Sequence, residues 1–139
     1  HLIEHIYQRK IEFFLQESYR VLKTGGLLIT ATPTYAKIID ALYGRNEFKK
    51  NLVYNNHKNS LFHRKPTPAR ILNCLSHINY GHKFILDFET YQDLAIKGGF
   101  TDNKTIKIQD IDDKEVKSFL KNKDDAFKTQ TEIFISKKY

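Results

Sequence analysis

The 139-residue chain contains one cysteine and no methionine. Cys74 has no partner for a disulfide within the chain, and without a cysteine pair no zinc site of the cysteine type is expected. No apolar run approaches the roughly 18 residues of a membrane-spanning helix, so no span is predicted. The first five residues lack the basic start and the apolar stretch of a signal peptide. These absences predict a reducing, cytoplasmic setting.

The basic residues are concentrated in one stretch. The net charge is +7, and Arg45–Lys65 carries six basic side chains against Glu47 alone, interleaved with Phe and Tyr. Such a stretch can bind nucleic acid through phosphate contacts and base stacking, close over an anionic small substrate, or be a solvated loop. The sequence leaves these three interpretations open.

Hydrophobic periodicity predicts alternating helices and strands. Tyr7–Lys23 has the apolar spacing of an amphipathic helix that ends at Gly25, and Leu27–Thr32 has the continuous apolar run of a strand buried on both faces in a parallel sheet. Further helices are predicted after Pro33, Thr67 and Asp87 and at Lys114–Asn122, and further strands at Thr105–Ile111 and Thr131–Ser136.

Three strands and about five helices are too few for a doubly wound domain. The strand Leu27–Thr32 is also too apolar for an open sheet edge, where unpaired strands invite association. Together with the missing methionine and the histidine at position 1, this predicts a sheet that has lost the strand before residue 1.

Two groups of residues carry a family resemblance. The first is His1-Leu2-Ile3-Glu4-His5-Ile6, followed by Phe14-Leu15-x-Glu17-x-x-Arg20-Val21-Leu22-Lys23-x-Gly25-Gly26 and Leu28-Ile29-x-x-x-Pro33. The second is Gly81-His82-Lys83-Phe84-Ile85-x-Asp87-x-Glu89-Thr90, followed by Gly99-Phe100. Together they resemble the C-terminal half of a class I S-adenosylmethionine-dependent methyltransferase of the type 11 kind. Thr24 stands where that family usually has proline.

The resemblance implies a truncated Rossmann-like α/β fold with the last three of seven strands. Residues 1–139 would then be the C-terminal part of one methyltransferase domain, with a basic insertion loop at about 45–66 and without the N-terminal cofactor-binding half. It implies methyl transfer from S-adenosylmethionine to a small molecule, and the second group of residues is similar to a subgroup that modifies sugar- or lipid-linked acceptors. The glycine-rich loop and the ribose-binding acid of the family are not in this sequence, so most of the cofactor site is expected outside the chain, which would be inactive alone.

Candidate site residues lie where ligands bind in open α/β sheets, beyond the carboxyl ends of strands. By resemblance His1 and Leu2 would contact the cofactor. His5, with Glu4 beside it, is the candidate base that removes a proton from a hydroxyl acceptor. Tyr35, His82 and Lys83 are the candidate acceptor-binding residues.

Each of these residues also has a structural interpretation. Glu4 and His5 could organise the start of the helix that follows, Tyr35 could begin a core-facing helix stripe, and His82 could tie down its loop through its ring nitrogens. Cys74 fits a small core residue. No metal site is expected, because His57, His63 and His77 lack a ligand at helical spacing.

A non-catalytic function remains the alternative: a methyltransferase-like module that binds nucleic acid or a protein partner through residues 45–65. Nucleic-acid binding would weaken steeply with salt, and neutralising Lys49, Lys50, Arg64 and Lys65 together would abolish that salt dependence, because each lysine or arginine displaces counterions from phosphates. Filter binding at several salt concentrations measures both effects. Unchanged binding by the neutralised variant would contradict this role, and a glycine-rich loop encoded upstream would favour the enzyme.

Overall fold

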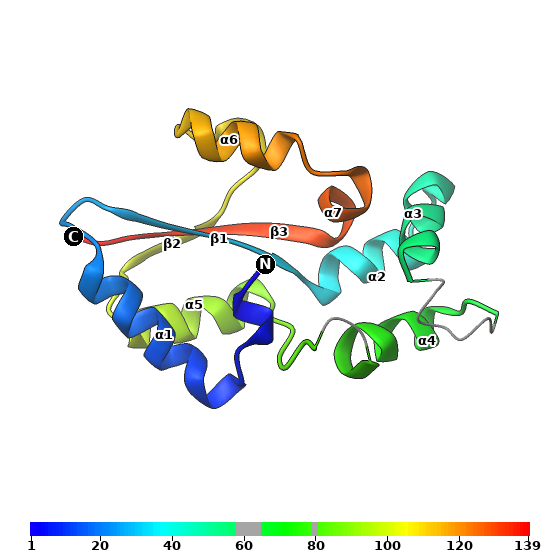
Figure 1. Cartoon of the computed structure of the whole chain (residues 1–139), viewed down its shortest axis with the longest axis horizontal. Helices are drawn as coiled ribbons and strands as arrows, with labels where there is room; N and C mark the ends of the chain where they lie inside the picture. The colour runs from blue at the N-terminus through cyan, green and yellow to red at the C-terminus, as the bar shows by residue number, and fades with distance from the viewer. Residues whose placement is uncertain (58–64, 79–80) are drawn as a thin grey trace.

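The computed structural model describes residues 1–57, 65–78 and 81–139. In these residues the fold is mixed α/β, with seven α-helices and a three-stranded antiparallel sheet (Figure 1). The strands are β1 (Leu27–Pro33), β2 (Asp102–Thr105) and β3 (Thr131–Lys137). The helices are α1 (Gln8–Val21), α2 (Tyr35–Tyr43), α3 (Glu47–His57), α4 (Pro68–Asn73), α5 (Phe88–Lys97), α6 (Lys114–Lys121) and α7 (Asp125–Gln130). Three short segments complete them: the 3-10 turns η1 (Ile3–His5) and η4 (Ile108–Asp110), and the π-helical η3 (Cys74–Ile78). No helix in the described ranges has both the length and the apolar content to cross a membrane.

The last strand in the sequence is the central strand of the sheet. β3 pairs antiparallel with β1 and with β2, so β1 and β2 run in the same direction on either side of it. Thr30 and Thr105 both pair with Phe134, one from each side. The carboxyl end of β1 meets the start of β3 where Pro33 pairs with Thr131. This end of the sheet carries the candidate site.

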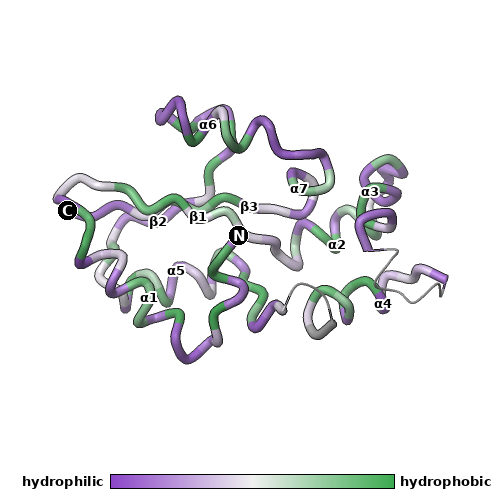
Figure 2. Tube along the Cα trace, in the orientation of Figure 1, coloured by the Kyte–Doolittle hydropathy of each residue, from purple (hydrophilic) through white to green (hydrophobic). Residues whose placement is uncertain are grey.

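Helices cover both faces of the sheet. α1 and α5 pack on one face through a core that includes Leu15, Tyr91 and Phe134, and α6 packs on the other through Leu120 against Ile133 (Figure 1). Along the tube of Figure 2 the apolar stretches of β1 and β3 lie between these two helical layers, and α1 alternates between apolar and hydrophilic residues, as its amphipathic spacing predicts.

A third group of helices extends beyond the site end of the sheet. Ile38 and Leu42 of α2 pack with Val53 of α3 and Ile71 of α4 in a separate apolar cluster. Cys74 is buried in the same cluster, which fits its interpretation as a small core residue. This lobe forms one wall beside the carboxyl end of β1.

A buried hydrogen-bond chain joins the sheet to α5. The Tyr91 hydroxyl lies 2.8 Å from Ser136 Oγ, and Ser136 donates to Asn103 Oδ1 at 2.6 Å. Burial raises the pKa of Tyr91, so its hydroxyl stays protonated and can donate to Ser136. The chain gives the buried Tyr91 and Ser136 hydroxyls hydrogen-bond partners within the core.

Several predictions of secondary structure are confirmed, namely the helices after Pro33, Thr67 and Asp87, the glycine turn at Gly25 and the final strand. Three others are wrong. The apolar run of β1 lies in an antiparallel pair and is exposed at Leu27, so it is not a strand buried throughout between parallel neighbours. Thr105–Ile111 is not a strand, because β2 ends at Thr105 and the chain turns into η4. Glu47–His57, expected as part of a basic loop, forms α3, and positions 58–64 of that stretch lie outside the described residues.

We expect Asp87→Ala to lower the free energy of unfolding by about 1 kcal/mol, because the Asp87 carboxylate accepts the Thr90 N–H at 2.8 Å as the N-cap of α5. Asp87→Asn keeps a capping oxygen and is the matched control. The Thr90 hydrogen bonds lower the pKa of Asp87 in the folded protein. The wild type should therefore be more stable than Asp87→Asn above the unfolded-state pKa of about 3.9. This difference should be lost as the pH falls through the lower pKa of the folded state. Urea unfolding across this pH range measures both effects, and equal midpoints for the wild type and Asp87→Ala would show that the cap does not stabilise α5.

Candidate functional site

The short turn η1 lies at the carboxyl end of β1. The backbone nitrogen of His1 donates to the Ala31 carbonyl at 2.8 Å, which places the start of the chain along β1 (Figure 1). The Glu4 carbonyl accepts two backbone N–H groups, from Lys83 at 2.7 Å and from Phe84 at 3.2 Å. These bonds hold η1 against the segment after η3, although the two are far apart in the sequence.

The Glu4 carboxylate is the buried centre of this region, with a side chain that is 0% exposed. Its Oε2 accepts a hydrogen bond from Thr32 Oγ1 at 3.3 Å. Its Oε1 lies 2.8 Å from His1 Nδ1 and 3.9 Å from His5 Nε2, yet it accepts no hydrogen bond of normal geometry from the described residues. A buried carboxylate oxygen without a hydrogen bond is costly, so this atom has unused capacity to bind a ligand.

Histidines from two segments, the first five residues and the turn at His82, lie around this carboxylate. The rings of His5 and His82 meet edge to face, with their centroids 4.9 Å apart. His82 Nδ1 lies 2.9 Å from the Leu75 carbonyl, which can only accept, so Nδ1 carries the proton and the lone pair of the neutral ring is on Nε2. Burial lowers the pKa of His82, with the Leu75 hydrogen bond acting in the opposite direction, and this favours the neutral ring.

His57 contributes a further buried imidazole. Its Nε2 lies 3.0 Å from Gln130 Oε1, and the Gln130 amide nitrogen donates to the Ala126 carbonyl at 3.2 Å. The amide orientation therefore makes His57 Nε2 the donor. Burial is the main cause that lowers the pKa of His57, so this ring too favours its neutral form.

A pocket of about 430 Å³ opens between these groups. Its lining includes four of the six histidines of the chain, namely His1, His5, His57 and His82. Gln130 and Thr131, which lie within hydrogen-bonding distance of His57 and His1, also line it. His1 Nε2 lies 3.0 Å from Thr131 Oγ1 at the start of β3. The pocket therefore combines imidazoles, a hydroxyl group and the exposed Asp124 carboxylate, with the buried Glu4 carboxylate behind His1 and His5, and this set suits a polar ligand that exchanges a proton or binds a cation.

The structure brings some of the predicted site residues together and separates others. His1, His5 and His82 line the pocket and Glu4 lies beside His1 and His5, whereas Tyr35 hydrogen-bonds Ser76 and packs against the α2–α4 cluster. Lys83 is exposed, with its Nζ 5.4 Å from the centre of the Tyr7 ring, and Leu2 is 59% exposed beside the site. The helix-start interpretation of Glu4 and His5 fails for α1, because its N-cap is Tyr7 and has no side-chain cap bond.

The grouping of Glu4, His5 and His82 is the feature that sequence reasoning missed. One potential ligand atom of each lies within 4.8 Å of the others. Each residue was a separate candidate. No metal site was expected, because the histidines were compared only by their spacing along one helix. The signal that could have found the group was the adjacent Glu4-His5 pair combined with His82 after a glycine turn. His57 and Gln130 gave no signal of their own.

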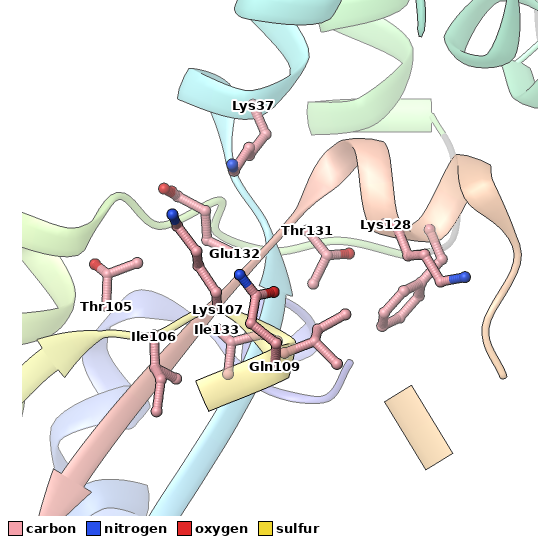
Figure 3. A pocket seen from close by; sticks show the side chains of 11 residues that line it. Lys37, Thr105, Ile106, Lys107, Gln109, Lys128, Thr131, Glu132 and Ile133 are labelled. Atoms are coloured by element: carbon pink, nitrogen blue, oxygen red, sulfur yellow. The ribbon is translucent and has the colours of Figure 1, made fainter. Parts of the chain in front are cut away.

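A second pocket, of about 310 Å³, lies at the outer side of the start of β3. Figure 3 shows the side chains that line it, which include Lys37 of α2, Lys128 of α7, and Lys107 and Gln109 of the segment after β2. Thr131 lines both pockets. The lysines give this second pocket a basic lining, moderated by Glu132.

Comparisons of the chain with protein-family models, with curated proteins and with solved structures found no match.

We expect His82→Ala to lower the free energy of unfolding by about 1 kcal/mol, because it leaves the Leu75 carbonyl without its imidazole donor. His82→Asn is the matched control, since an asparagine amide nitrogen can occupy the position of Nδ1 and keep this bond. Urea unfolding of the three proteins measures the difference. If both variants lose the same stability, the His82–Leu75 bond is not what holds this segment.

Proposed function

We propose that the chain is part of an S-adenosylmethionine-dependent methyltransferase of the Rossmann-like class that methylates a small-molecule acceptor, with a sugar- or lipid-linked molecule as the acceptor class. The observation that carries the proposal is the position of the histidine pocket. The residues that resemble the family form a helix, a glycine turn and a strand, and the pocket lies at the carboxyl end of that strand. This is the side on which open α/β sheets bind ligands.

S-adenosylmethionine would supply the methyl group from its sulfonium to an acceptor atom. The exposed Leu2 side chain and the pocket-lining His1 fit one side of such a cofactor. In the described part of the chain, no glycine turn leads from a strand into a helix: Gly25 precedes β1, Gly81 precedes residues 84–86 and Gly99 follows α5. The described residues therefore fit only part of the cofactor, and the rest of its site would come from outside them.

The contribution of this chain is to hold the acceptor and to take its proton. A hydroxyl acceptor in the pocket could donate to His5, whose side chain is 37% exposed and lines the cavity. The Glu4 carboxylate, 3.9 Å from His5 Nε2, would stabilise the positive charge that the ring gains with the proton. The buried His57 and the half-buried His82 line the pocket and would shape the space that the acceptor occupies.

The first test is a calorimetric titration with S-adenosylmethionine of the 139-residue chain and, if its gene encodes residues before His1, of the complete gene product. We expect one-to-one micromolar binding by the complete product and no measurable binding by the shorter chain, because the described residues fit only part of the cofactor. A complete gene product that neither binds S-adenosylmethionine nor transfers its methyl group would overturn the proposal.

The second test concerns the base. In the complete, active protein we expect His5→Ala to lower turnover by at least about a hundredfold and to leave the affinity for S-adenosylmethionine unchanged, because the base acts on the acceptor. Lys10→Ala, an exposed substitution on α1, is the control and should leave both quantities unchanged. Methyl transfer by His5→Ala at the wild-type rate would remove His5 from this role.

The described part of the basic stretch gives no observation that favours the nucleic-acid alternative. Lys49 lies 3.5 Å from Asp40, and Lys50 lies 3.6 Å from Glu47, so both lysines of α3 have acidic neighbours that reduce their charge toward a phosphate. The methyltransferase therefore remains the proposed function.

A further inference from the structure

We infer that Glu4, His5 and His82 form a binding site for a divalent transition-metal cation. The cation would lie against the wall of the 430 Å³ pocket that His5 and His82 line. Its affinity for these three side chains does not depend on the methyltransferase proposal.

The three potential ligand atoms are close enough to bind one ion after a small rearrangement. The three potential ligand atoms lie within 4.8 Å of one another, and Glu4 Oε1 and His5 Nε2 are 3.9 Å apart. Metal–ligand bonds of about 2.0–2.2 Å in a tetrahedral arrangement place ligand atoms about 3.4 Å apart. The excess is about 0.5 Å for Glu4 and His5 and at most about 1.4 Å for the other pairs, and small rotations of the His5 and His82 rings can supply it, whereas Glu4 is fixed by burial.

The surroundings orient two of the ligands toward the ion. The Leu75 carbonyl holds His82 Nδ1–H and so directs the lone pair of Nε2 away from that bond. The Thr32 hydroxyl holds Glu4 Oε2, which leaves Oε1 facing the histidines. Carbonyl and hydroxyl groups in these positions are the usual outer partners that fix metal-ligating imidazoles and carboxylates.

The second, independent observation is the state of Glu4 Oε1. This atom is fully buried and accepts no hydrogen bond of normal geometry from the described residues, although His1 Nδ1 lies 2.8 Å from it and His5 Nε2 lies 3.9 Å from it. A cation at this position would satisfy it and would offset the cost of burying the carboxylate.

The ligand set selects the class of cation. Two imidazoles and one carboxylate are typical of Zn²⁺ and of neighbouring first-row metals in sites that keep a position open for water or substrate. Mg²⁺ and Ca²⁺ prefer oxygen ligands alone and are disfavoured here. The open position would face the pocket.

Where the proposed function also holds, the cation changes the role of His5. The acceptor hydroxyl would bind the cation at the open position. The cation would lower the pKa of that hydroxyl, and the hydroxyl proton would then pass to water. His5 would then be a ligand and not the base. This part of the inference rests on the proposed function, whereas the metal site itself does not.

The test is a titration of the metal-free chain with Zn²⁺ and, separately, with Co²⁺, whose visible absorption reports its coordination. We expect a one-to-one complex. Glu4→Gln, His5→Ala and His82→Asn should each weaken it by more than about tenfold, because even the loss of an outer partner of a metal ligand typically costs about tenfold or more. His82→Asn is the sharpest variant because it removes the Nε2 ligand and keeps a donor for Leu75. Urea unfolding of each metal-free variant shows that it is folded.

The control is His57→Gln, which removes an imidazole of the same pocket that lies outside the three-residue group, and we expect it to leave the affinity unchanged. No one-to-one complex with the wild type, or equal weakening by His57→Gln and His82→Asn, would overturn the site. A complete protein that binds Zn²⁺ through this site but does not bind S-adenosylmethionine would support the metal site and contradict the methyltransferase. A complete protein that binds S-adenosylmethionine but not Zn²⁺ would contradict the metal site and support the methyltransferase.

Discussion

The burial of one carboxylate governs the arrangement of this molecule around its pocket. Glu4 has no exposed surface, so its charge must be compensated by the side chains packed against it. Thr32 of β1 supplies a hydrogen bond, and His1 and His5 supply imidazole nitrogens. The backbone carbonyl of the same residue accepts the N–H groups of Lys83 and Phe84. One residue thereby connects the start of the chain, the first strand and the segment before α5.

This compensation is incomplete, which distinguishes the region from an ordinary structural ion pair. One carboxylate oxygen is hydrogen-bonded by Thr32, while the other faces two imidazoles without a hydrogen bond from the described residues. A buried charge of this kind is weak evidence for stability, because replacing a buried ion pair by well-packed apolar side chains is often neutral or stabilising. Retention of a partly compensated charge next to a cavity is typical of groups that bind or transfer something. The proposed metal site rests on that reasoning.

The sequence predicted those parts of the fold that depend on neighbouring residues. The apolar spacing of α1, the glycine turn before β1, and the caps Thr67 and Asp87 are local signals, and the structure confirms them. The sequence did not predict α3, because the lysines and asparagines of this helix obscure its short apolar stripe. The sequence misplaced β2, because its four residues, Asp102–Thr105, are polar and become a strand only by pairing with β3. The site follows the same division: Glu4, His5 and His82 were each recognisable as candidates, but the fold alone brings His82 to the other two.

The central position of β3 also affects how the chain folds as it is made. Among the described residues β1 and β2 are not neighbours, and both pair with Thr131–Lys137. While the ribosome is still adding these residues, α1 and α5 have one apolar face without the sheet that covers it. The sheet must therefore assemble in a late, non-local step, and such steps are slow because a long loop has to close first. Until then the nascent chain presents two unpaired strands to its surroundings, which is the period in which a chaperone would be most useful.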